Sequence, residues 1–356
     1  MQQTRRRRYV VLAEGEFGQA ASKTAIGVIR YASDRVVAVI DSTRAGRNAS
    51  EWLGPAFDIP IVATLDEALA FEPDSLLLGT APAGGRIPPD WRRTVLAAIN
   101  AGLDVVSGLH EFLSDDAEFS TAARAAGVEL IDHRRPPAVN VVARGRAHRP
   151  GTRVVLTVGT DCAIGKMTVA LELRRAALDA GLAAVFVATG QTGIMIEGWG
   201  IAVDRVISDF VAGASESLVE RAESMGDWVF VEGQGSIDHP SYSPVTLGLI
   251  HGTTPHAMVM VHESGRTVRH GWEDRPGFAS TLKSLDENIR AYEQVAGLVA
   301  PSRVLAIALN TMHLSDDEAR ATIERVRHET GLTTDDPVRF GAGRLLEAIR
   351  VGLGDA

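Results

Sequence analysis

Short apolar runs alternate with amphipathic stretches along the first part of the chain, and this alternation predicts strands and helices in turn. The expected strands are residues 9–13, 35–40, 75–78, 104–106 and 128–131. The expected helices are residues 23–31, 65–70, 91–101 and 116–126. Gly102 and Gly127 follow the last two helices and are typical stop signals. Strands that alternate with helices of this length indicate a parallel, doubly wound sheet.

A second alternation starts at residue 153 and predicts another α/β domain. Its expected strands are residues 153–158, 183–188, 228–231, 258–261 and 304–309. Its expected helices are residues 166–180, 215–224, 281–295, 316–330 and 345–351. The stretch 133–150 is rich in arginine and proline, which is typical of a passage between domains. We therefore place one domain in residues 1–148 and the other in residues 149–356.

The composition agrees with two folded domains and excludes several classes of function. The chain has 356 residues, of which 45% are hydrophobic and 23% charged, so it can bury two cores. Apolar runs such as 183–188 are far shorter than the ~20 residues that cross a bilayer, so no membrane span is expected. A net charge of −9 without a basic face argues against nucleic acid as a partner. The single cysteine, Cys162, suits a reducing cytoplasm, and small-molecule chemistry is the expectation that remains.

The strongest chemical signal is the turn GTDCAIGKMT between the expected strand 153–158 and the expected helix 166–180. Consecutive backbone N–H groups and a helix N-terminus form a cradle for anions in such a turn. The chain has three lysines, Lys23, Lys166 and Lys283, and Lys166 stands where a phosphate-binding loop needs a compact positive charge. We expect Lys166 to lie exposed in this loop. The expected phosphate-binding residues are Gly159, Thr160, Asp161, Cys162, Ala163, Ile164, Gly165, Lys166, Met167 and Thr168.

The turn departs from the usual phosphate-loop pattern at two places. Five residues, rather than four, separate Gly159 from Gly165. Met167 stands where a serine or threonine hydroxyl normally ligates Mg²⁺, and Thr168 comes one place late, which is a rotation of ~100° on a helix. The loop is therefore expected to bind phosphates better than it cleaves them. Cys162 inside the loop is either a small filler or a nucleophile whose pKa the helix N-terminus lowers.

Polar residues after the other strands of the second domain complete the expected site. Glu232 follows the apolar strand 228–231 directly and is expected to point toward the phosphate loop. The segment 189–193 is a polar, glycine-rich turn at another strand end, where open α/β sheets bind ligands. The sequence has no paired cysteines and no HExxH spacing, so no metal site is expected. The expected substrate-binding residues are Gln191, Thr192, Asp209, Gln234, Ser236 and Arg266.

These motifs resemble those of known protein families. The loop GTDCAIGK is similar to that of dethiobiotin synthetase, and the segment 231–236 resembles the acidic strand end of the same family. The turns 79–86 and 107–111 are similar in plan to the CoA-binding Rossmann domain of succinyl-CoA synthetases. The resemblances imply an α/β fold, with a Rossmann-like N-terminal domain and a P-loop NTPase-like, doubly wound C-terminal domain.

Along nearly its whole length the chain resembles one bacterial family, long described only as a domain of unknown function. The features that carry this resemblance are Glu14-Gly15, Lys23-Thr24-Ala25, the GTDCAIGKMT loop, residues 189–193, Val203-Asp204, Asp209-Phe210 and residues 231–236. Its characterised members are D-glutamate or D-amino-acid N-acetyltransferases. The resemblance implies that acetyl-CoA acetylates a D-amino acid, and that a partner epimerase then acts on the product.

The residues are compatible with such a reaction. A cradle that lacks the Mg²⁺ hydroxyl can still hold the phosphates of CoA. Transfer from a thioester to an amine needs a base, for which Glu232 and His239 are both candidates. It also needs donors for the tetrahedral oxyanion, which Gln191 and Thr192 or Gln234 and Ser236 can supply. Arg266 is expected to clamp the carboxylate of the amino acid.

Two other functions remain open at this point. One is an ATP-dependent ligase of the dethiobiotin-synthetase type, with ATP and Mg²⁺ as its cofactors. The other is a nucleotide-sensing regulatory module without turnover. We also expect the protein to form a homo-oligomer.

Overall fold

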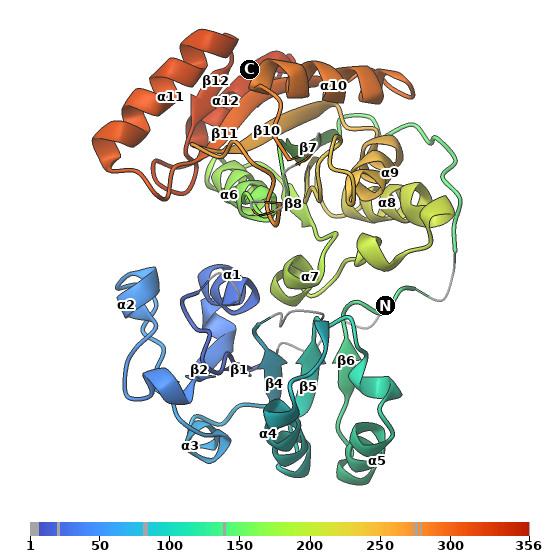
Figure 1. Ribbon diagram of the computed structural model, residues 1–356. Helices are drawn as coiled ribbons and strands as arrows, with labels where there is room; N and C mark the ends of the chain where they lie inside the picture. The colour runs from blue at the N-terminus through green and yellow to red at the C-terminus, as the bar shows by residue number, and fades with distance from the viewer. Residues whose placement is uncertain are drawn as a thin grey trace. The chain divides into compact units, whose positions relative to one another are not determined.

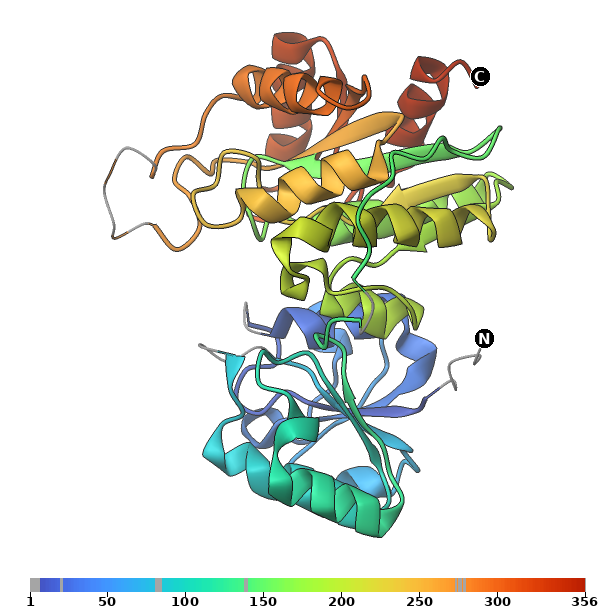
Figure 2. The same ribbon diagram turned by 90° about the vertical axis from the view of Figure 1, so that its right-hand side faces the viewer.

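The computed structural model describes residues 7–19, 22–80, 85–137, 140–272, 274, 277 and 280–355. The chain forms two compact units, each built on one six-stranded sheet (Figure 1, Figure 2). The first unit takes in the chain up to Pro136 together with Ile194–Ala202, and the second takes in Pro137–Gly193 and the chain from Val203 onward. All strand pairs within both sheets are parallel, which confirms the predicted fold class.

The sheet of the first unit has the strand order β3-β2-β1-β4-β5-β6. Its strands are β1 (Tyr9–Leu12), β2 (Val36–Ile40), β3 (Ile61–Val62), β4 (Ser75–Leu78), β5 (Asp104–Ser107) and β6 (Leu130–Asp132). Its helices are α1 (Lys23–Tyr31), α2 (Ser50–Leu53), α3 (Leu65–Leu69), α4 (Pro89–Asn100) and α5 (Ala117–Ala126). The predicted strands and helices of this half are all present. The sequence pattern missed β3 and α2, because elements of two and four residues are too short to show a period.

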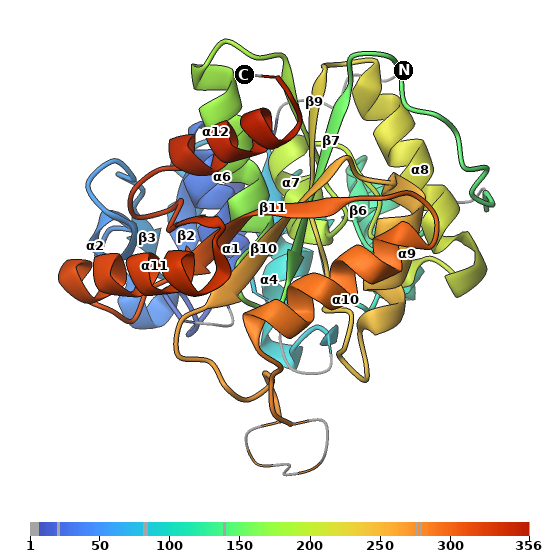
Figure 3. The same cartoon turned by 90° about the horizontal axis from the view of Figure 1, so that it is seen from above.

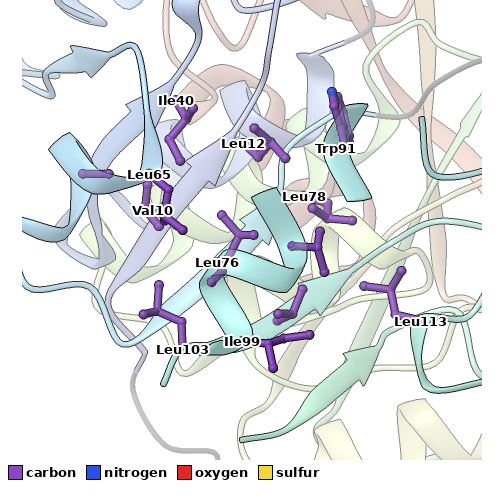
Figure 4. Packing of buried hydrophobic residues seen from close by; sticks show 14 of the residues in the cluster. Val10, Leu12, Ile40, Leu65, Leu76, Leu78, Trp91, Ile99, Leu103 and Leu113 are labelled. Atoms are coloured by element: carbon purple, nitrogen blue, oxygen red, sulfur yellow. The ribbon is translucent and has the colours of Figure 1, made fainter. Parts of the chain in front are cut away.

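One face of this sheet packs against helices through a continuous apolar core (Figure 4). Val10 and Leu12 of β1 and Leu76 and Leu78 of β4 alternate toward that face, and Ile99 of α4 belongs to the same core. Each of these five side chains is at most 1% exposed. Burial of a large aliphatic side chain stabilises a fold by ~1.5–3 kcal/mol, so this layer holds the first domain together.

The carboxylate that follows β2 is used inside the first domain. Asp41 is fully buried and accepts hydrogen bonds from the backbone N–H groups of Gly15 and Phe17, both at 3.1 Å. Burial opposes its ionisation, but these bonds and one from Thr43 hold the pKa of Asp41 below its ordinary value. Dinucleotide-binding domains use an acidic residue near this place to bind a ribose. Here the carboxylate instead fixes the turn after β1.

The sheet of the second unit has the strand order β12-β11-β10-β7-β9-β8, with β7 between β9 and β10 (Figure 3). Its strands are β7 (Arg153–Gly159), β8 (Ala184–Val187), β9 (Trp228–Val231), β10 (Ala257–Glu263), β11 (Arg303–Asn310) and β12 (Thr333–Asp335). Its helices are α6 (Lys166–Asp179), α8 (Ser208–Glu223), α9 (Ser243–Thr253), α10 (Leu285–Gly297), α11 (Asp316–Thr330) and α12 (Gly343–Gly352), and α7 (Gln191–Glu197) follows β8. Because the strands are parallel, the loops after β7, β8, β9 and β10 meet at one edge of the sheet.

Helix α9 and the first two turns of α8 are absent from the sequence-based prediction. Glycine weakens a helix signal, and α9 contains Gly248 and Gly252 within eleven residues. The structure shows why both positions are glycine. A Cβ at Gly248 would lie 2.4 Å from Val211 of α8, and one at Gly252 would lie 2.1 Å from the carbonyl oxygen of Ala212. The two helices therefore pack too closely for a side chain at either position.

Candidate active site

The predicted phosphate loop lies between the end of β7 at Gly159 and the start of α6 at Lys166. A Cβ at Gly159 would lie 2.6 Å from Cδ1 of Ile164 and 3.1 Å from the carbonyl oxygen of Val261 in β10. Gly165 has a φ of 109°, a conformation that side chains rarely adopt. Both glycines are therefore required by the shape of the turn.

A tyrosine of α10 fixes the start of this loop. The Tyr292 hydroxyl donates to the carbonyl of Gly159 at 2.7 Å and accepts from the backbone N–H of Ile237 at 3.0 Å. Tyr292 is fully buried, and burial raises the pKa of its hydroxyl, which stays neutral. One side chain thus anchors both the phosphate loop and the loop after β9.

Lys166 is buried rather than exposed, which corrects the sequence-based expectation. Only 6% of the residue is exposed, and Nζ donates to the carbonyl of Asp161 at 2.6 Å. Burial lowers the pKa of its ammonium group from 10.5 to about 8, because the charged form loses hydration. The ammonium group therefore bonds to the loop itself, and a bound phosphate would compete for it.

Asp161 anchors the middle of the loop. Its fully buried carboxylate accepts from Arg266 Nη1 at 3.0 Å and from the backbone N–H of His270 at 2.8 Å. Its second oxygen accepts from the backbone N–H of Cys162 at 2.8 Å. Arg266 also donates to Glu263 at 2.6 Å. Arg266 therefore already bridges two carboxylates of the protein, and its expected contact with a substrate carboxylate stays a prediction.

The surroundings of Cys162 do not activate its thiol. Burial and the adjacent Asp161 carboxylate raise the pKa of Cys162 to about 11. The alternative of a nucleophile with a lowered pKa is therefore disfavoured, because lost hydration and the neighbouring negative charge both raise this pKa. At neutral pH the side chain is a thiol, which favours the filler role over the nucleophile.

Glu232 follows β9, and its carboxylate turns toward the end of the neighbouring strand β8. Oε2 accepts from the backbone N–H groups of Thr189 at 2.9 Å and Gly190 at 3.0 Å. Burial nevertheless raises the pKa of Glu232 to about 7, although both bonds favour the ionised form. The charges of Glu232 and Lys166 also act on each other. A carboxyl group with a pKa near 7 is suited to take up and release a proton at neutral pH.

The polar segment after β8 is a strand-to-helix junction rather than the turn predicted. Its helix, α7, already begins at Gln191. Gly193 in this helix faces Glu232, since a Cβ there would lie 2.6 Å from Oε2. Gln234 Nε2 donates to the carbonyl of Thr189 at 2.5 Å. The junction and the loop after β9 therefore enclose the Glu232 carboxylate together.

The other expected substrate-binding residues have differing surroundings. Ser236 donates to Asp238 at 3.1 Å, and Asp238 is paired with Arg269. Asp209 is exposed in the first turn of α8, and the two residues that open α7 are half-buried. Contacts of these residues with a substrate stay predictions.

His239 lies beside the phosphate loop. The residue is 1% exposed, and its Nδ1 accepts from the backbone N–H of Ser241 at 3.1 Å. One of its ring nitrogens lies within 4.8 Å of a carboxylate oxygen of Asp161 and of Sγ of Cys162. The loop after β7 and the loop after β9 therefore lie together, as predicted for residues that follow neighbouring parallel strands.

Although Asp161, Cys162 and His239 have the spacing of a metal-ligand set, their bonding does not suit a metal ion. The Asp161 carboxylate is already paired with Arg266, and the thiol of Cys162 resists ionisation. A metal-bound imidazole normally donates its other N–H to an acceptor, whereas Nδ1 of His239 faces a donor. We therefore assign no metal to these residues.

Sequence reasoning missed three residues that shape the site. Asn310 at the end of β11 donates to the carbonyl of Ile164 at 3.4 Å, and its place after an apolar strand is a signal that could have found it. Tyr292 lies within a helix, where nothing in the pattern marks it. His270 acts through its backbone N–H, so its residue type gives no signal.

The fold and site define a two-domain protein with a Rossmann-like N-terminal domain and a P-loop C-terminal domain, and the chain belongs to the DUF1611 family. Residues 141–346 match the P-loop domain of this family, described as a domain of unknown function, and residues 42–136 match its Rossmann-like domain. A crystal structure of a DUF1611 family protein from Anabaena variabilis is similar, with a TM-score of 0.90 and 40% sequence identity. It covers 97% of this chain and 99% of that one.

Two similar curated proteins are named D-glutamate N-acetyltransferase. The one from Tritonibacter scottomollicae is 38% identical over 329 residues, which are 92% of this chain and 94% of that protein. The one from a Pseudoalteromonas species is 36% identical over 281 residues, or 79% of this chain and 82% of that protein. These similarities confirm the family that the sequence motifs indicate. Within the part of the chain that the structure describes, every helix is too short or too polar to span a bilayer.

Proposed function

We propose that the protein transfers the acetyl group of acetyl-CoA to the amino group of D-glutamate or a similar D-amino acid. The observation that carries this proposal is the place of the buried Glu232 carboxyl group, which follows β9, the strand paired with β7, from which the phosphate loop starts. Burial raises its pKa to about 7, which suits proton transfer at neutral pH. The names of the two relatives, which match most of this chain, support the same reaction class.

In this proposal the phosphate loop binds a phosphate group of acetyl-CoA. The backbone N–H groups of the loop and the N-terminus of α6 favour an anion, and Lys166 supplies a positive charge once it releases the Asp161 carbonyl. Met167 provides no hydroxyl for Mg²⁺. A CoA phosphate can bind without a metal ion, so the missing hydroxyl does not prevent CoA binding. The transfer of a phosphoryl group from a triphosphate does need Mg²⁺, so the missing hydroxyl disfavours that reaction.

Glu232 is the proposed general base. The amino group of an amino acid is protonated at neutral pH and must lose a proton before its lone pair can attack a thioester. A carboxylate whose conjugate acid has a pKa near the working pH accepts that proton and later returns it to solvent. The enclosing backbone N–H groups of Thr189 and Gly190 hold the carboxylate in place.

An ATP-dependent ligase of the dethiobiotin-synthetase type is the alternative, with ATP and Mg²⁺ as cofactors. The strand-loop-helix order around Lys166 is the observation that favours it, because this arrangement also serves nucleotide triphosphates. In that case Glu232 would hold the metal rather than accept a proton.

The test follows free thiol release from acetyl-CoA with the purified full chain. We expect release that depends on D-glutamate, exceeds that with L-glutamate and is unaffected by a chelator. No ATP hydrolysis is expected under the same conditions. If no amine stimulates thiol release while an amine stimulates ADP formation with Mg²⁺-ATP, the ligase replaces the transferase.

We further propose a partner enzyme, a cellular compartment and an oligomeric state. The N-acetyl-D-amino acid product is the substrate of a partner epimerase, as the family resemblance implies. The protein works in the cytoplasm, for which its single cysteine is the support. It assembles as a homo-oligomer, which size-exclusion chromatography with light scattering would establish.

A further inference from the structure

The imidazole of His239 is held in one orientation. Nδ1 accepts from the backbone N–H of Ser241 at 3.1 Å. The ring stacks on Tyr242 with centroids 4.5 Å apart, and Trp272 meets it edge-on at 6.4 Å. A ring with one hydrogen bond and two aromatic neighbours has little freedom to turn over, so its second nitrogen keeps a fixed direction.

The hydrogen bond from Ser241 also determines which ring nitrogen carries the proton. A nitrogen that accepts an N–H bond presents its lone pair, so in the neutral imidazole the hydrogen is on Nε2. Burial lowers the pKa of His239, although Asp161 opposes the shift, and the neutral form predominates at pH 7. Nε2–H is therefore a hydrogen-bond donor and offers no lone pair to take up a proton.

This donor is buried and unused. Among the residues that the structure describes, Nε2 has no hydrogen-bond partner, although the residue is 1% exposed. A buried donor without an acceptor destabilises the folded state, so such a group in a native protein calls for a reason. A ligand atom that accepts a hydrogen bond would supply one.

The surroundings of the ring indicate where that ligand atom would lie. One ring nitrogen is within 4.8 Å of Asp161 and Cys162 in the phosphate loop. The Asp161 carboxylate is already bonded to Arg266 and to the loop backbone. The charge of Lys166 acts on both His239 and Glu232, so all three side chains belong to one neighbourhood.

We propose that His239 donates its Nε2–H to the thioester carbonyl oxygen of the acyl donor and stabilises the oxyanion formed during acyl transfer. This inference rests on the proposed function. It removes His239 from the two candidates for the general base and leaves Glu232 as the base.

The reaction then balances as follows. The amine lone pair forms a C–N bond to the carbonyl carbon, and the π electrons of the C=O bond move onto oxygen, where Nε2–H is the donor. Before the attack, Glu232 takes the first proton of the ammonium group and releases it to solvent. The attacking nitrogen then carries one proton too many, and this second proton passes to the Glu232 carboxylate. When the C=O bond re-forms, the C–S bond breaks and its electron pair leaves with the CoA sulfur, which takes up the second proton from Glu232. His239 keeps its own proton throughout.

Two variants of His239 separate a donor from a base. His239→Gln restores an N–H donor but cannot act as a base, whereas His239→Phe keeps the aromatic stacking and removes the donor. Loss of one oxyanion donor costs ~10²–10³-fold in kcat, so we expect that loss for His239→Phe, with the KM for acetyl-CoA unchanged. We expect His239→Gln to recover kcat to within about tenfold of the wild type, on the basis of the same donor argument. His328→Gln, at an exposed position of α11, is the matched control.

The pH dependence of kcat/KM in the two His239 variants gives a second test. Both His239 variants should keep the acidic limb of kcat/KM, because that limb belongs to Glu232. Equal inactivity of the two folded variants together with loss of the acidic limb would make His239 the base and overturn the proposal. Full activity of His239→Phe would overturn it as well.

A readout that needs no turnover separates this inference from the proposed function. In ¹⁵N-labelled protein at pH 7, the His239 ring should show the neutral Nε2–H form, and its Nε2 signal should shift when acetyl-CoA is added. A neutral Nδ1–H form, or an Nε2 signal that acetyl-CoA leaves unmoved, would contradict the inference. Absence of thiol release by a wild type that shows the expected shift would instead contradict the proposed function.

Discussion

Replacing Glu232 by glutamine is expected to lower kcat by ~10²–10⁴-fold, the range attributed to a general base, while leaving the affinity for acetyl-CoA unchanged. Glutamine has nearly the same shape, and its carbonyl oxygen can still accept from Thr189 and Gly190. It cannot accept the amine proton. Steady-state kinetics and calorimetric titration with acetyl-CoA measure the two effects separately.

The same variant should change two pH dependences. A base works in its ionised form, so wild-type kcat/KM should rise as the pH passes through about 7, and this limb should vanish in Glu232→Gln. The native state also binds the Glu232 proton more tightly than the unfolded chain does. The wild type should therefore lose stability as the pH rises from 4.5 to about 7, and the variant should not.

The control for Glu232→Gln is Glu324→Gln, at an exposed position of α11, which should behave as the wild type. If Glu232→Gln kept full activity, the carboxylate would not be the base. If its activity fell only in parallel with a lost response to Mg²⁺, the carboxylate would be a metal ligand and the ligase would gain support.

Replacing Lys166 by methionine is expected to weaken acetyl-CoA binding by ~10–100-fold, since a charge-assisted hydrogen bond contributes ~1.5–3 kcal/mol. The stem of Lys166 lies inside the protein, and methionine can fill most of that space. The fold should therefore survive. Calorimetric titration with CoA and acetyl-CoA, compared with the exposed Lys283→Met, measures the loss.

Lys166→Met should weaken acetyl-CoA binding but increase the folding stability near pH 8. The buried Lys166 ammonium has a pKa of about 8, below its ordinary 10.5, so protonation opposes folding. The wild type should lose stability as the pH falls from 10.5 to about 8, and Lys166→Met should avoid that loss. Thermal unfolding across this range checks the sign. Unchanged CoA affinity in a folded Lys166→Met would remove the lysine from the binding site.

The architecture could be predicted from the sequence because central strands such as β1, β4 and β9 are buried on both faces and the helices alternate with the strands regularly. β4, β9, α1 and α11 have the bounds that the pattern predicts: Ser75–Leu78, Trp228–Val231, Lys23–Tyr31 and Asp316–Thr330. Parallel strands then place the loops after β7 and β9 side by side, since Leu156 pairs with Val231. This pairing of parallel strands explains why the sequence could predict that Glu232 lies near the phosphate loop.

The electrostatic state of the site could not be predicted, because it depends on burial and on partners distant in sequence. Lys166 donates a hydrogen bond to the carbonyl of Asp161 in its own loop. The surroundings of Cys162 raise the pKa of its thiol. Arg266 lies 105 residues from Asp161 in sequence yet pairs with it. A motif shows which residue types are present. Their protonation states and their unpaired hydrogen-bond donors depend on how the loops after β7, β8, β9 and β10 pack together.

The most direct test of the central claim follows the acetyl group itself. The full chain is incubated with acetyl-CoA whose acetyl group carries deuterium and with D-glutamate, in the presence of a chelator and without ATP, and the products are identified by mass spectrometry. We expect labelled N-acetyl-D-glutamate in an amount equal to the thiol released. Thiol release without labelled amide, or amide that forms only when ATP and Mg²⁺ are supplied, would contradict it.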